Sequence, residues 1–175
     1  MPKLITVQRP EQIAEQAKSY VKTYILLPSG LLGFVSMIVG VAGLGYQLVA
    51  TDSYTWGTFL QSSALILLGV GMGLAQTKYH QYLLQTFPEI LAARIRSAVT
   101  KDNKKAKKGK TEGPVPTIDH AGRQFVPALY ALGAGVILGA SWLAVSIGQV
   151  ALVPAVLLPW AGFYWARLFF WRGRV

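Results

Sequence analysis

The sequence predicts an all-α integral membrane protein with four transmembrane helices, arranged as two hairpins that are joined by a basic cytoplasmic loop. Three observations predict this class. The 175-residue chain is 53% hydrophobic and only 14% charged, whereas an ordinary soluble domain is about 25% charged. Long stretches carry no charge and can cross a hydrocarbon core of about 30 Å as helices. The 17 basic residues lie beside those stretches. This placement favours a role in membrane orientation over nucleic-acid binding.

Residues 1–23 are expected to form a cytoplasmic amphipathic helix that lies on the membrane surface. Pro10 suits the first turn of a helix, and apolar residues then recur at helical spacing as far as Lys22. This segment has no apolar core of the kind that a cleavable signal peptide needs. The first span is therefore expected to direct insertion itself.

Residues 24–77 predict the first hairpin, with spans at about 27–50 and 54–77 that are separated by the turn TDSY. Gly69 and Gly73 form a GxxxG pattern in the second span, and small residues at this spacing let helices approach closely. We expect the two spans to pack antiparallel against each other. In the first span, an alternating spacing of four and three places small and polar residues on one face, namely Ser29, Gly33, Ser36, Gly40, Gly43 and Gln47.

Residues 78–123 predict a basic cytoplasmic loop, with a surface helix at about 88–99 that starts at Pro88. A solvated connector is expected after this helix, because the composition there cannot bury a core. Its positive charge favours contact with anionic headgroups or an acidic partner. No sequence-specific nucleic-acid recognition is expected, since aromatic residues are not interleaved with the lysines. Six lysines lie within ten residues: Lys101, Lys104, Lys105, Lys107, Lys108 and Lys110.

Residues 124–171 predict the second hairpin, followed by a basic tail at 172–175. No charge occurs in the 43 residues from Gln124 to Ala166, which is too many for one span and enough for two. The spans are placed at about 125–147 and 150–170.

Small residues and prolines distinguish these two spans. Gly135 and Gly139 form a GxxxG pattern in the third span, for which a helix-packing role is expected. Pro154 and Pro159 are expected to kink or loosen the fourth span, because proline removes a backbone donor.

The distribution of basic residues predicts the orientation. The N-terminal segment holds four, the central loop ten and the C-terminal segment three, while the two opposite turns hold none. By the positive-inside rule, both termini and the loop are cytoplasmic. The expected location is a bacterial cytoplasmic membrane or a thylakoid-type membrane.

The chemistry expected of the chain is limited. Cysteine is absent, which excludes disulfides and thiolate metal sites, and no catalytic constellation is evident, so an enzyme is not predicted. His80 and His120 flank the central loop at similar depth, where two imidazoles could ligate haem or one could ligate chlorophyll. Because both histidines lie outside the apolar runs, no cofactor is expected, and haem or chlorophyll binding is kept as an alternative.

The function predicted from these features is that of a non-enzymatic accessory, scaffold or assembly subunit of a larger membrane complex. Its expected partners are membrane lipids and other membrane subunits. Two alternatives stay open at this point: a small permease or channel component, and a haem- or pigment-binding subunit that uses His80 and His120.

Overall fold

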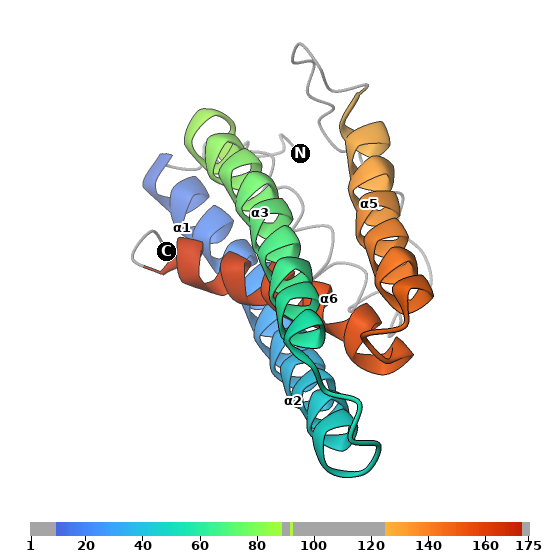
Figure 1. Cartoon of the computed structure of the whole chain (residues 1–175). Coiled ribbons are helices and arrows are strands. Elements are labelled where there is room, and N and C mark those ends of the chain that lie inside the picture. Colours follow the sequence, from blue (N-terminus) through green and yellow to red (C-terminus); the bar gives the residue numbers. More distant parts are fainter. Residues whose placement is uncertain (1–9, 89–91, 93–124, 173–175) are drawn as a thin grey trace, which may run out of the picture.

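The structure, a computed structural model, describes residues 10–88, 92 and 125–172 (Figure 1). In this part of the chain, four helical stretches are long and apolar enough to span a membrane, which confirms the all-α class and is compatible with the four predicted spans. The elements are α1 (Pro10–Tyr20), η1 (Val21–Leu26), α2 (Leu27–Val49), α3 (Trp56–Thr86), α5 (Phe125–Ile147) and α6 (Leu152–Trp171).

The first three elements form one continuous helical run, where the sequence predicts a separate surface helix before the first span. η1 is a π-helical segment that ends just before Pro28. Proline lacks an N–H and its ring crowds the carbonyl four residues earlier. A wider π turn makes room for the ring without ending the helix. α1 therefore leads directly into α2 and packs on the ends of α3 and α6 (Figure 1).

α3 is longer than the predicted span and does not end at Lys78. It starts at a capping box, in which the Thr55 hydroxyl accepts from the Thr58 N–H and the Thr58 hydroxyl accepts from the Thr55 N–H. It then runs for 31 residues, roughly 46 Å at 1.5 Å per residue. The chain leaves the helical conformation at Phe87, with φ −137° and ψ 60°, because the residue before Pro88 is disfavoured in the α region.

α6 is the central helix of the described structure. It packs against both α2 and α3 along most of its length, whereas direct contacts between α2 and α3 are few. The expected antiparallel packing of the first two spans on each other is therefore wrong, since the fourth span provides the packing surface for both. α5 makes far fewer contacts, and it makes them with α3 and α6 (Figure 1).

The two short turns lie together at one end of the bundle. The first follows α2 and places Asp52 in the left-handed region at φ 49°, which a short polar side chain tolerates better than most. The second contains Gly148 at φ 79°, where glycine has no Cβ penalty. At the opposite end, α1 and the last turns of α3 and α6 enclose Trp171.

Candidate functional site

The small-residue stripe of the first span faces α6. A Cβ atom added at Gly40 would lie 2.9 Å from Leu158 Cδ2, and one at Gly43 would lie 2.9 Å from Pro154 Cδ. At Gly33 it would lie 3.0 Å from Tyr164 Cβ. No larger residue fits these positions without movement of α6. The stripe is also the buried face of α2, with Ser29, Gly33, Ser36, Gly40 and Gln47 buried.

The GxxxG pattern of α3 also meets α6, and there the two backbones touch. A Cβ at Gly69 would collide with the carbonyl oxygen of Pro159, and one at Gly73 would collide with the carbonyl of Phe163. From the other side, Gly162 of α6 faces the carbonyl of Ile66. Each glycine therefore directs a Cα hydrogen toward a carbonyl of the facing helix, a geometry that recurs where helices approach closely.

The role of α6 as the shared partner is not predicted from the sequence. Its α3-facing residues are spaced by four, three and four and include Ala155, Pro159, Gly162 and Ala166, all of which are buried. Leu158 and Pro154 are buried as well, on the side toward α2. A signal was present in the sequence, because α6 combines small residues on more than one face with the lowest hydropathy of the four spans.

The two turns are joined by side-chain hydrogen bonds. The Gln47 amide nitrogen donates to the carbonyl of Gln149 at 3.3 Å, and its oxygen accepts from the Ala151 N–H at 3.1 Å. Thr58 also donates its hydroxyl proton to the Gln149 carbonyl, at 2.8 Å. Gln47 thus connects α2 to the start of α6, and Thr58 connects α3 to the same turn.

α5 leaves its own GxxxG pattern uncovered. A Cβ added at Gly135 or Gly139 would meet no atom of the described chain within 4 Å. Two residues before Gly135, at Gly133, an added Cβ would collide with the Met72 side chain, so the Gly133 face of α5 is directed toward α3. The Gly135 and Gly139 pair, which the sequence predicts to pack, is therefore exposed. The glycine stripe of α2 and the glycine pair of α3 are instead in contact with α6.

Two glutamines on the Met72 face of α3, Gln61 and Gln76, each have a buried amide oxygen without a hydrogen-bond donor in the described chain. By contrast, the Ser62 and Ser141 hydroxyls donate to carbonyls of their own helices at 3.0 Å and 2.9 Å. These two hydroxyls therefore donate within their own helix and not to a neighbouring one.

Two ionisable groups, His80 and Arg167, lie within the long helices, whereas the sequence predicts His80 in the loop. His80 lies within α3 and is partly buried, with its ring 6.0 Å from that of Tyr79. Arg167 lies within α6, and its guanidinium carbon is 5.5 Å from the ring centroid of Phe163. Among the described residues, no three His, Asp or Glu side chains group in a way that could hold a metal ion. His120 and the six lysines of the predicted loop lie outside the described residues, as does the predicted surface helix apart from Pro88 and Ala92.

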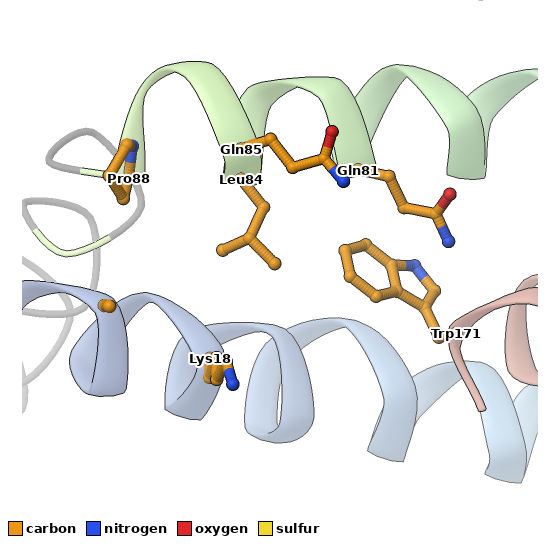
Figure 2. Close-up of a pocket in the computed structure, with 7 residues that line it drawn as sticks. Lys18, Gln81, Leu84, Gln85, Pro88 and Trp171 are labelled. Carbon is orange, nitrogen blue, oxygen red and sulfur yellow. The ribbon is translucent and has the colours of Figure 1, made fainter. Parts of the chain in front are cut away.

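A pocket of about 290 Å³ lies between α1, α3 and the end of α6. Figure 2 shows the Trp171 indole at one end of it, between α1 and α3. Trp171 is 1% exposed, yet its indole nitrogen has no hydrogen-bond partner in the part of the chain that the structure describes. The lining combines apolar and polar side chains: Ala14, Lys18, Gln81, Leu84, Gln85, Pro88 and Trp171.

Comparisons of the chain with protein-family models, with curated proteins and with solved structures find no match.

Proposed function

We propose that the protein is a non-enzymatic accessory subunit of a larger membrane complex, and that the exposed Gly135 and Gly139 face of α5 receives a transmembrane helix of another chain. The observation that carries this proposal is the contrast among the glycines of three helices. The glycine stripe of α2 and the Gly69 and Gly73 pair of α3 meet α6, whereas the pair on α5 has no neighbour in the described chain.

The physical reason lies in how helices associate in lipid. Lipid tails are as apolar as the helices, so association depends on close van der Waals packing at small residues. Glycine also costs about 1 kcal/mol of helix propensity relative to alanine. On α2 and α3 close contact offsets that cost. A partner helix on α5 would supply the same compensation.

Two further features support an interaction role over transport. α6 fills the space between α2 and α3 with side chains and backbone in contact, and Ser62 and Ser141 donate to carbonyls of their own helices. The thin contacts of α5 with α3 and α6 leave most of its surface free for another chain. The same α5 face would serve an assembly factor or a permanent subunit.

Native mass spectrometry after mild detergent extraction tests the proposal. The parent chain should be recovered in a hetero-complex, and the double variant Gly135→Leu/Gly139→Leu should lose the partner. Gly71→Leu is the matched control, because an added Cβ at Gly71 also meets no described atom within 4 Å. Gly71 is not part of a GxxxG pattern, since neither residue four positions away is glycine. The control should keep the partner.

Three results would contradict the proposal. A closed homo-oligomer would favour the permease alternative. A visible absorption band from the purified protein would favour the haem or pigment alternative. Equal partner recovery with the double variant and with the parent would show that the α5 face is not used.

A further inference from the structure

The pocket beside Trp171 has more hydrogen-bond donors than its neighbours can use. Within the described residues, the indole N–H of Trp171 is buried without an acceptor. Beside it, the Gln81 amide nitrogen donates one of its two hydrogens to the Phe170 carbonyl at 2.7 Å. Figure 2 shows the amide nitrogen of Gln81 directed toward the indole nitrogen. The second Gln81 hydrogen and the indole N–H therefore lie near each other, and no acceptor from the described chain bonds to the indole.

Rotating the Gln81 amide does not remove this excess. The rotation would place the amide oxygen toward the indole, but it would also place an oxygen against the Phe170 carbonyl and lose a 2.7 Å hydrogen bond. A buried donor without an acceptor is destabilising. An acceptor supplied by a ligand would satisfy both donors without disturbing the helix end.

Charge at the pocket favours an anionic acceptor. Lys18 lines the pocket, and the lining contains no acidic residue. Gln85 adds a second amide. Glu15 lies one turn before Lys18 and is exposed to solvent. The lining of the cavity thus includes a positive side chain, two amides, the indole of Trp171 and an apolar wall.

The position of the pocket indicates where such an anion would come from. α3 is roughly 46 Å long at 1.5 Å per residue, about 16 Å more than the hydrocarbon core. Leu84 and Gln85 are in its last turn and Pro88 follows it, beyond the apolar stretch, at the depth of lipid headgroups. Tryptophan is enriched at this depth because its N–H reaches polar groups while its rings stay in apolar surroundings.

We infer that this pocket binds the phosphate headgroup of an anionic membrane phospholipid. The phosphate oxygens accept hydrogen bonds from the Trp171 indole and the Gln81 amide, and Lys18 offsets the negative charge. Leu84, Pro88 and the indole rings contact the apolar part of the headgroup region. The volume of about 290 Å³ lies at the lower limit of small-molecule sites, which begin at about 300 Å³, so it suits a headgroup and not a macrocycle. This inference does not depend on the α5 face.

Lipid retention measured by native mass spectrometry on the full-length protein tests this inference, with phosphatidylglycerol as the probe. The parent should retain one phosphatidylglycerol more tightly than phosphatidylcholine. Lys18→Gln should weaken retention about tenfold, because a hydrogen bond to a charged group is lost. Trp171→Phe, which keeps the ring and removes the N–H, should weaken it several-fold. Lys22→Gln should have little effect, because Lys22, unlike Lys18, does not line the pocket.

Several outcomes would overturn the inference. Equal losses from Lys18→Gln and Lys22→Gln would show nonspecific attraction to the lipid surface. Equal retention of phosphatidylglycerol and phosphatidylcholine would show that charge is not recognised. Displacement of the lipid by an equal concentration of inorganic phosphate would identify a site for the free anion instead.

Discussion

Gln47 illustrates how one polar side chain positions two helices. Both ends of its amide are used, one on the Gln149 carbonyl and the other on the Ala151 N–H. The side chain is 6% exposed, so solvent does not readily replace either bond. The neighbouring Thr58 shares the Gln149 carbonyl, which accepts two hydrogen bonds as a carbonyl oxygen can.

Gln47→Met should therefore destabilise the protein. Methionine has similar length but forms neither bond, and it leaves the Ala151 N–H without an acceptor. The expected loss is about 1–3 kcal/mol, read as a lower midpoint of thermal unfolding in detergent. Leu48→Met is the control, since Leu48 is 55% exposed. If both variants unfold at the same temperature as the parent, Gln47 does not hold the turns together.

At the scale of elements, two glycines within one turn of α3 have opposite surroundings, since one contacts α6 and the other is exposed. A Cβ at Gly69 would collide with the Pro159 carbonyl of α6, whereas a Cβ at Gly71 would meet no described atom within 4 Å. Both residues belong to the same helix, so their intrinsic helix propensities are equal. A difference between them reports on packing alone.

Gly69→Ala should lower the midpoint of thermal unfolding, because overpacking that displaces a backbone costs about 1–3 kcal/mol. Gly71→Ala should leave the midpoint unchanged or raise it, because the gain in helix propensity stabilises the protein by up to about 1 kcal/mol. The same midpoint for the two alanine variants would mean that α3 and α6 are farther apart than described.

The α2–α6 contact offers a second comparison. Gly40→Leu would push its side chain into Leu158, which is 2.9 Å from the position of an added Cβ. The substitution also makes the span more apolar, so insertion should persist while stability falls, by about 1–3 kcal/mol for overpacking. Ile38→Leu should be tolerated, because Ile38 is 51% exposed. Thermal unfolding and membrane fractionation of both variants measure the two effects separately, and a Gly40→Leu protein that unfolds like the parent would place the stripe against lipid.

The elements also show what could be predicted from the sequence. The spacing of Gly33, Ser36 and Gly40 identifies the buried face of α2, because a period near 3.5 marks one line on a helix. The identity of the facing helix could not be derived, since a small-residue stripe fits any neighbour that approaches closely. The continuous helix through Pro28 was missed for a similar reason, because a π turn before proline has no distinctive composition.

The pocket beside Trp171 was also beyond the reach of the sequence. Its walls come from α1, α3 and α6, and they meet only because α1 continues from α2 and α3 extends to Thr86. The amphipathic helix and the end of the second span are predicted as separate segments, so no cavity between them is predicted. The aromatic residues at the end of α6 were the available signal, because tryptophan and tyrosine are enriched at membrane interfaces.

For the whole molecule, the arrangement of the ends is consistent with the topology that the basic residues predict. The turns that carry no basic residue lie together, and α1 and the last turns of α3 and α6 lie at the opposite end (Figure 1). Lys18, Lys78 and Arg172 belong to this second end and are exposed. An insertion with this end in the cytoplasm satisfies the positive-inside rule for every one of these residues.

Cysteine accessibility in intact cells or sealed vesicles of known orientation tests this account most directly. The chain has no cysteine, so Ser53→Cys and Ser19→Cys each introduce a single thiol at an exposed serine. A membrane-impermeant thiol reagent applied from the non-cytoplasmic side should label position 53 and not position 19, and both should be labelled after detergent is added. Labelling of position 19 from that side, alone or together with position 53, would contradict the four-span arrangement with cytoplasmic termini.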